Sequence, residues 1–499
     1  MKKSAIAFSV PLPFLVFMVQ DLNSSIIKDN VGFYVGLIRA ATCIGICISS
    51  MPWGMLSDRI GRRPVILLSI GGSAMSIFML GMSKSITWII SSSFLLGLLD
   101  GSLPALRCFV SEITIHHTNT QRSLAMSTLE LGVGLGCAVG PLIGSLLMDP
   151  ATQYPKMLST TSWLKDFLVK YPYILPCFTS TCISTVVAAC TFAILEETAP
   201  PCTMNPKTYS SLESHTMLNK RASYKTFENR ISSPPLKDQK SKRKALGIFR
   251  SLRESLTRSI FLGINMKCLN GFYSLYYQTL FAIWTAWNVH QGGLGFSPSD
   301  IGSTFFYAGV WQVVAQFTIL PMLTKRFSNL HLLRMLLIGI AISFSISGMI
   351  HCIYDMGSID AGNSSKDNKR LWVWISALVL ISLITSLDNM TSAVSMVLVN
   401  NAASSRPSTL GTINGCTSFG LGMALAAGPA TAGVIWSIAQ NIDWIAAPLR
   451  GILPWQFIAL FVVIPLSISF LMNARDYEVP RSIDTAEEST SIEPFIECC

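Results

Sequence analysis

The connection between two long apolar stretches has the sequence Gly54-Met55-Leu56-Ser57-Asp58-Arg59-Ile60-Gly61-Arg62-Arg63-Pro64. Gly54 would let two helices approach closely, and Asp58 places a negative charge at a helix end. The three arginines either obey the rule that puts basic residues at the cytoplasmic face of a membrane or form a charge latch with Asp58. The spacing G-x-x-x-D-R-x-G-R-R favours the latch.

The apolar character extends over the whole chain of 499 residues. Half of the residues are hydrophobic, 13% are charged, and the mean hydropathy is +0.48. Soluble domains carry about 25% charged residues. The composition therefore argues against a soluble enzyme, an intrinsically disordered protein and a nucleic-acid-binding protein. It favours a chain that is solvated by lipid, even though the formal net charge is +10.

Apolar stretches of about 17–25 residues, which span a bilayer as helices, recur along the chain. We predict twelve spans in two groups of six, at 4–20, 32–54, 64–82, 86–110, 123–148, 173–195, 259–287, 300–322, 332–353, 371–398, 408–437 and 452–473. The stretch between the groups is polar and rich in Ser, Pro and Lys, which indicates a flexible, partly disordered cytoplasmic linker. The predicted parts are an N-terminal six-helix bundle (1–195), the linker (196–257), a C-terminal six-helix bundle (258–474) and an acidic cytoplasmic tail (475–499).

Basic residues and glycosylation sequons orient the predicted spans. With both termini in the cytoplasm, the inner connections hold more Lys and Arg than the outer ones, although the linker supplies most of the excess. The sequons at Asn23 and Asn363 then fall in outer connections, and the sequon at Asn389 falls inside a span, where it would be unused. We therefore expect both termini in the cytoplasm.

The fifth predicted span is rich in small residues. It contains Gly132, Gly134, Gly136, Gly140-Pro141 and Gly144-Ser145. Gly and Pro weaken the local hydrogen-bond ladder and let a neighbouring helix pack tightly. The stretch is either a general small-residue contact or a bendable helix face, and its candidate hinge residues are Gly136, Gly140, Pro141 and Gly144.

Both patterns resemble signatures of one family. The loop at 54–63 resembles that of the major facilitator superfamily, and 136–145 resembles the G-x-x-x-G-P-x-x-G-G pattern of its antiporters, with Ser145 in place of the last glycine. The resemblance implies two bundles that rock about a shared site near the middle of the membrane. Arg107 and Glu112, near the inner end of the fourth span, would join the loop residues in gating that motion.

A narrower resemblance is carried by Ser111-Glu112, Asp149-Pro150, Tyr154-Pro155, Gly292-Gly293-Leu294-Gly295-Phe296-Ser297, Asn414-Gly415 and Gly428-Pro429. With the loop, these segments are similar to the zinc-induced facilitator-like group of plants and its fungal relatives. That resemblance implies a proton-coupled carrier of the vacuolar or plasma membrane for metal chelators, organic ions or alkali cations. The chain departs from related transporters at Ser93, where they place an arginine, and at Thr324-Lys325-Arg326, a reduced second-half copy of the loop.

Ionisable residues inside predicted spans are functional candidates by default, because a charge in lipid is costly. Three carboxylates, Asp100, Glu130 and Asp388, lie in the fourth, fifth and tenth spans. Each either takes up a proton on one side and releases it on the other, or is paired for structure. Arg39 either pairs with one of them or holds an anionic substrate. Lys267 either neutralises a carboxylate or extends its ammonium group toward the interface.

Polar and aromatic side chains gather in the seventh and eighth spans, and such a set suits organic substrates, including cations. An interface belt with packing is the alternative, which we prefer for the tryptophans of these spans. An amide that faced lipid would lack hydrogen bonds, so the glutamines favour a cavity. The candidate substrate-cavity residues are Arg39, Tyr277, Gln278, Gln312 and Gln316.

The sequence thus predicts an all-α membrane protein with the major facilitator fold and no catalytic residues, which exchanges a small organic solute or cation for protons. No P-loop occurs, and His116-His117 lacks a third ligand, so we expect no cofactor and no metal, with the proton gradient as energy source. The expected partners are the lipid bilayer and a small-molecule substrate, without nucleic acid, for a monomeric carrier. A uniporter on the same fold, which Ser93 favours, and a membrane sensor or scaffold without transport are the alternatives.

Overall fold

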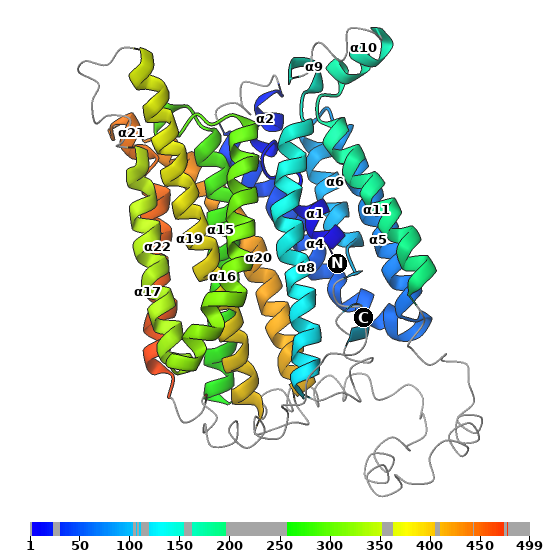
Figure 1. Ribbon diagram of the computed structural model, residues 1–499, viewed down its shortest axis with the longest axis vertical. Coiled ribbons are helices and arrows are strands. Elements are labelled where there is room, and N and C mark those ends of the chain that lie inside the picture. The colour runs from blue at the N-terminus through cyan, green and yellow to red at the C-terminus, as the bar shows by residue number, and fades with distance from the viewer. Residues whose placement is uncertain are drawn as a thin grey trace, which may run out of the picture. The chain divides into compact units, whose positions relative to one another are not determined.

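The computed structural model describes residues 2–22, 30–102, 106, 109–110, 119–153, 162–195, 257–351, 363–404, 410–442, 444–473 and 477. The regular structure in these ranges is helical (Figure 1). It divides into two compact units, one within residues 1–255 with 297–306 and the other within 256–296 with 307–499. Most of the predicted linker and tail lies outside the described residues.

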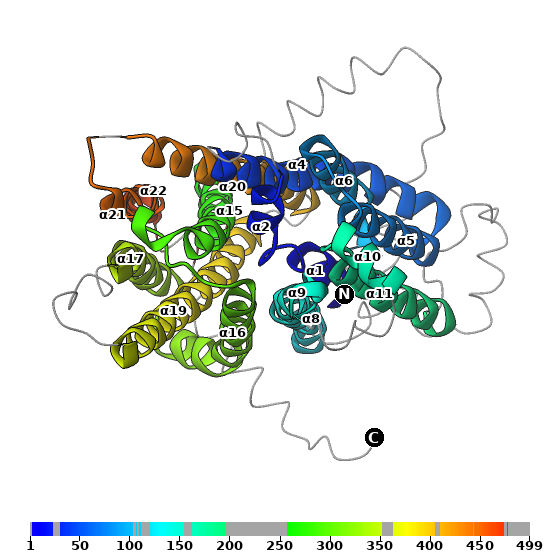
Figure 2. The same cartoon turned by 90° about the horizontal axis from the view of Figure 1, so that it is seen from above.

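The first unit contains α1 (Lys2–Ser9), α2 (Leu15–Gln20), α4 (Val31–Ile60), α5 (Arg62–Gly81), α6 (Ile86–Leu99), α8 (Asn119–Leu147), α9 (Pro150–Gln153), α10 (Ser162–Lys170) and α11 (Ile174–Ile194). Within it, α4 packs on α6, α5 on α11, and α1 on α8 (Figure 2). Glycines bring the first pair together, because a Cβ on Gly97 would lie 1.9 Å from the carbonyl oxygen of Thr42 and one on Gly45 would lie 2.5 Å from that of Phe94. Close backbone approach of this kind is typical of packed membrane helices.

Two predicted spans of this unit are interrupted. The first forms α1 and α2 with turns between them, because Pro11 and Pro13 lack the N–H groups that would continue the helical ladder. The fourth was expected to run to residue 110, but α6 ends at Leu99. There the N–H of Gly101 donates to Ser69 Oγ of α5 at 2.9 Å. A side chain of the neighbouring helix thus holds the backbone just after the end of α6, where the same N–H also donates to the carbonyl oxygen of Leu99 at 3.1 Å.

The second unit contains α15 (Arg258–Ala286), η2 (Val289–Gln291), α16 (Pro298–Arg326) from Tyr307 onward, α17 (Asn329–Ser347), η3 (Gly348–His351), α19 (Asn363–Ser404), α20 (Leu410–Gln440), α21 (Ala447–Arg450) and α22 (Leu453–Leu471). Helix α15 is central, because it packs against α19, α20 and α22. A Cβ on Gly428 of α20 would lie 2.5 Å from the carbonyl oxygen of Phe272, so these two helices touch along their backbones.

Each of the twelve predicted stretches overlaps a described helix. Among the described residues, eight helical segments are long and apolar enough to cross a membrane, while α6 and the 134–147 part of α8 are shorter apolar helices. The helices expose large apolar side chains, including Leu68, Met75, Phe192 and Leu460. Such exposed surface suits a lipid environment. The structure confirms the helical fold for the described ranges, with helices of a length and composition that suit a membrane, and it resolves the number of spans in part.

Candidate functional site

The carboxylate of Asp388 in α19 is 4% exposed and lies against α15. Its Oδ1 accepts a hydrogen bond from Asn270 Nδ2 at 2.9 Å. Its Oδ2 accepts from Ser274 Oγ at 2.7 Å and from Tyr277 Oη at 3.3 Å. Burial of a carboxylate is costly unless hydrogen bonds compensate it, and these three neutral donors supply that compensation.

The donors share one face of α15, because their spacing of three or four residues corresponds to successive helical turns. Lys267 begins the same row, and its Nζ donates to the carbonyl oxygen and to Oγ of Ser392 at 2.9 and 2.6 Å. Ser392 lies one turn after Asp388 on α19. We call this set the Asp388 cluster; its members are Lys267, Asn270, Ser274, Tyr277, Asp388 and Ser392.

Buried aromatic rings lie beside the Asp388 cluster. The ring of Tyr277 is centred 5.7 Å from that of Phe344, which in turn lies 6.1 Å from Trp455. Trp284 packs against Trp455 at 5.4 Å and is fully buried, whereas Trp311 is 47% exposed. These rings give the cluster an apolar surrounding, in which hydrogen bonds to the carboxylate are electrostatically stronger than in water.

The predicted cavity residues differ in burial and in hydrogen-bond partners. Tyr277 contacts Asp388 directly, as described above. Gln278 and Gln312 are partly buried. Gln316 Oε1 is buried and has no hydrogen-bond partner in the part of the chain that the structure describes. Of this group, the structure brings only Tyr277 into hydrogen-bond contact with the carboxylate. Sequence reasoning missed Asn270 and Ser274, although their spacing along one helix face was a usable signal.

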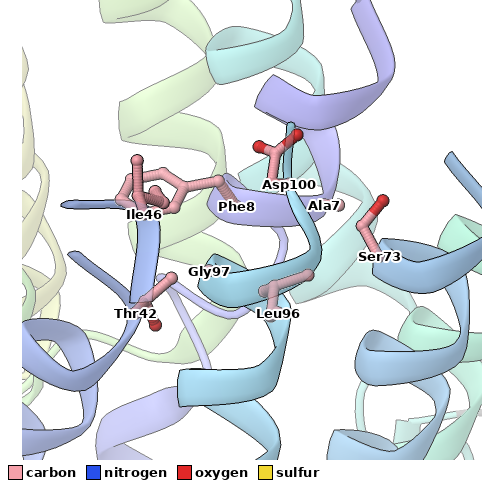
Figure 3. A pocket seen from close by; sticks show the side chains of 8 residues that line it. All are labelled: Ala7, Phe8, Thr42, Ile46, Ser73, Leu96, Gly97 and Asp100. Carbon is pink, nitrogen blue, oxygen red and sulfur yellow. The ribbon is translucent and has the colours of Figure 1, made fainter. Parts of the chain in front are cut away.

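A small cavity lies in the first unit, between α1, α4, α5 and the end of α6 (Figure 3). Its volume is about 10 Å³, roughly the room that one water molecule needs, and the wider space of about 220 Å³ around it includes open solvent. Its lining residues are Ala7, Phe8, Thr42, Ile46, Ser73, Leu96, Gly97 and Asp100. Asp100 Oδ1 accepts from Ser102 Oγ at 2.8 Å. Asp100 directly follows Leu99, the last residue of α6, so it lies at a helix end and not inside a helix that runs over the whole predicted span 86–110.

The other charged candidates of the spans are Arg39 and Glu130. The guanidinium of Arg39 is 5% exposed and lies 4.9 Å from the centre of the Phe8 ring. The side chain of Glu130 lies outside the described residues. The proton-coupling roles of Asp100, Glu130 and Asp388 stay predictions.

The backbone conformation of the loop between α4 and α5 explains why its motif has a glycine at Gly61. Gly61 has φ +101°, in the left-handed region that side chains disfavour. Arg62 Nη1 donates to Ser57 Oγ at 3.0 Å, while Arg63 donates to the carbonyl oxygen of Phe192 in α11 and lies over its ring.

The expected close helix contact at Gly54 is wrong for the described residues, because a Cβ there meets none of their atoms within 4 Å. The latch stays a prediction, since the side chains of Asp58, Arg59, Arg107 and Glu112 lie outside the described residues.

The glycines of the fifth span pack against α1. A Cβ on Gly140 would lie 2.0 Å from Ser9 Oγ, and one on Gly144 would lie 2.1 Å from the carbonyl oxygen of Val10. Ser9 Oγ also donates to the carbonyl oxygen of Gly136 at 3.1 Å. The predicted tight packing is confirmed, and Pro141 lies inside α8. The bending of this helix stays a prediction.

Comparison with known proteins identifies a family whose sequence model matches this chain. A family model described as the Major Facilitator Superfamily matches residues 4–429. Major facilitator-type transporter psiT2 of Psilocybe cyanescens is 29% identical over 463 residues, which cover 88% of this chain and 83% of the relative. Protein ZINC INDUCED FACILITATOR-LIKE 1 of Arabidopsis thaliana is 26% identical over 472 residues, which cover 93% and 87%.

Solved structures show a similar fold. A bacterial homolog to the human lysosomal transporter Spinster, in an inward-facing and occupied conformation, matches with a TM-score of 0.62 at 13% identity and covers 96% of both chains. The D-xylose-proton symporter matches with a TM-score of 0.56 at 14% identity, covering 92% of this chain and 93% of its own. At these identities the likeness concerns the arrangement of helices alone.

Proposed function

Because the chain belongs to the major facilitator superfamily, and is therefore a multi-pass membrane transporter and not an enzyme, we propose that it exchanges a small organic solute or cation for protons. In an exchanger, solute and proton must each bind differently in the inward-open and outward-open states, or no coupling occurs. The proposal therefore needs a group that can gain and lose a proton inside the membrane-spanning part.

The Asp388 cluster is the observation that carries this proposal. The hydroxyls of Ser274 and Tyr277 donate to the carboxylate, but a hydroxyl can also accept a hydrogen bond from a protonated carboxyl group. Asn270 binds the other oxygen and need not move. The cluster can therefore satisfy both protonation states of Asp388 with small hydroxyl rotations. This is the property that a reversible proton carrier requires, so we assign the role to Asp388 ahead of Asp100 and Glu130.

The solute class and the location are supported by sequence features. The zinc-related name of the Arabidopsis relative and the resemblance to the zinc-induced facilitator-like group favour a small organic solute or cation. Both termini are assigned to the cytoplasm from the distribution of basic residues and from the sequons at Asn23 and Asn363. We assign the carrier to a vacuolar or plasma membrane, as a monomer, on the same resemblance.

The experiment uses the purified full chain in vesicles that contain a trapped pH-sensitive dye, with equal pH on both sides. Solutes whose levels differ between a deletion strain and its parent are added outside one at a time. We expect at least one solute to enter saturably and to raise the internal pH, as protons leave in exchange. Saturable entry without a change in pH would establish a uniporter. Entry of none of the solutes would favour a sensor or scaffold.

A further inference from the structure

Arg39 of α4 is a buried cation, and the described part of the chain holds no counter-ion for it. Its side chain is 5% exposed, and Nε and Nη2 have no hydrogen-bond partner among the residues that the structure describes. The titratable side chains near it are the thiols of Cys43 and Cys137, and no described carboxylate is among them. A guanidinium stays charged under physiological conditions, so it cannot relieve its burial by losing a proton.

An unpaired charge of this kind is costly in a protein interior and in a membrane. The ring of Phe8 compensates part of the cost, because the guanidinium lies 4.9 Å from its centre. A ring face, however, accepts none of the N–H hydrogen bonds. Proteins commonly retain a destabilising group when function requires it. For Arg39, a ligand that binds during the transport cycle would supply the missing hydrogen-bond acceptors.

The position of Arg39 connects it to the cavity of the first unit. Phe8, whose ring lies under the guanidinium of Arg39, also lines that cavity. Thr42, about one helical turn after Arg39, lines it as well (Figure 3). Arg39 itself does not line the cavity, whereas the carboxylate of Asp100 does, so the link between the guanidinium and this space is the ring of Phe8. A planar guanidinium binds carboxylate and phosphate groups through two parallel hydrogen bonds.

We propose that Arg39 is the anchor for a carboxylate or phosphate group of the transported solute, which makes the solute an organic anion or a zwitterion. This proposal rests on the proposed transport function and narrows its substrate class. It predicts that the charge at residue 39 is used in binding and contributes nothing favourable to folding.

The first test needs no solute and measures the unfolding temperature of the detergent-solubilised full chain. Arg39→Met should unfold at or above the wild-type temperature, because a partnerless buried charge is replaced by an apolar side chain. The matched control is Arg450→Met, which should lower the temperature, since Arg450 donates to the carbonyl oxygens of Ile445 and Gln440. If Arg39→Met unfolded as early as this control, Arg39 would be a structural residue and the proposal would fail.

The second test adds probes to the same sample: benzoate, phenyl phosphate and the neutral analogue benzamide. Benzoate or phenyl phosphate should raise the unfolding temperature of the wild type more than benzamide does, and Arg39→Gln should weaken binding of the anion roughly tenfold or more. Equal effects of benzamide and the anions, or no effect of either anion, would overturn the proposal. Stabilisation by an anionic phospholipid alone would overturn the assignment to a solute.

A double variant separates ligand binding from an internal ion pair. If Arg39→Gln is destabilised and Arg39→Gln with Glu130→Gln regains the wild-type unfolding temperature, Arg39 pairs with Glu130 and the proposal fails. We expect no such recovery. These measurements do not depend on proton movement, so failure of the anion site is distinguishable from failure of the proposed exchange.

Discussion

Nδ2 of Asn270 lies 2.9 Å from Oδ1 of Asp388, a hydrogen bond that joins residues 118 positions apart. It connects α15 to α19 and leaves the second carboxylate oxygen to the hydroxyls of Ser274 and Tyr277. An amide nitrogen only donates, so this bond is strongest when Asp388 is ionised. The balance between the two forms of Asp388 therefore depends on Asn270.

Replacing Asn270 by Leu tests that dependence. Leu keeps most of the volume but removes the donor, so the ionised form of Asp388 loses a charge-assisted hydrogen bond. A bond of this kind is worth about 1.5–3 kcal/mol, and the pH of half-maximal exchange should rise by roughly one to two units. The measurement is the pH profile of solute-driven exchange in vesicles.

Asn265→Leu is the control for that variant. Asn265 lies on the same helix, but its Nδ2 donates to the backbone oxygen of Phe261 and not to Asp388. Its pH profile should match the wild type. If Asn270→Leu also left the profile unchanged, Asp388 would not titrate during exchange.

The contact between α4 and α6 should tolerate no side chain at residue 97. A Cβ in Gly97→Ala would lie 1.9 Å from the backbone oxygen of Thr42, which cannot move without shifting the helix. Overpacking of this kind costs about 1–3 kcal/mol. We expect a clearly lower unfolding temperature for Gly97→Ala by fluorescence-detected size-exclusion chromatography. Gly71→Ala should behave like the wild type, because no described atom lies within 4 Å of a Cβ there. Equal behaviour of the two variants would contradict the packing.

The packing of α8 on α1 predicts that a second substitution restores stability lost through the first. Gly140→Ala should lower the unfolding temperature, because its Cβ would lie 2.0 Å from Ser9 Oγ. Adding Ser9→Gly removes that oxygen, so the double variant should regain at least part of the loss, with an interaction energy of about 0.5–3 kcal/mol in a double-mutant cycle. Additive losses would show that the contact is not the cause.

The loop at 54–63 makes a kinetic prediction. Asp58→Asn removes the negative charge of the predicted latch but leaves the binding residues intact. Turnover should therefore fall several-fold while the apparent affinity for solute changes little, as expected when only the barrier between states is altered. Initial rates of exchange over a range of solute concentrations give both quantities. A normal turnover rate would remove the latch from the mechanism.

The helices were largely predictable because a span needs about 20 predominantly apolar residues to cross a bilayer, although α6 has 14 residues and α19 has 42. The end of α6 at Leu99 was not, since the chain just after it is held by a hydrogen bond from the N–H of Gly101 to Ser69 of α5, a contact that no local pattern records. Gly61 was recognised as a motif residue, and the structure adds that its positive φ requires glycine.

The candidate site was predicted one residue at a time. A carboxylate in a span is conspicuous in a sequence, so Asp388 was recognised. Its donors Asn270 and Ser274 are ordinary polar residues, and which carboxylate they serve depends on how α15 packs on α19. Pairing across helices is a tertiary property, so it became visible only in the structure.

The most direct test of proton coupling replaces Asp388 by Asn, which keeps the shape of the side chain but cannot exchange a proton. Asp300→Asn is the matched control, because Asp300 accepts hydrogen bonds from Ser297 at the start of α16 and lies outside the Asp388 cluster. Solute-driven proton movement should fall to the level of empty vesicles in Asp388→Asn and persist in the control, while exchange of labelled for unlabelled solute continues in both. Proton movement at the wild-type ratio in Asp388→Asn would contradict the account and transfer the role to Asp100 or Glu130.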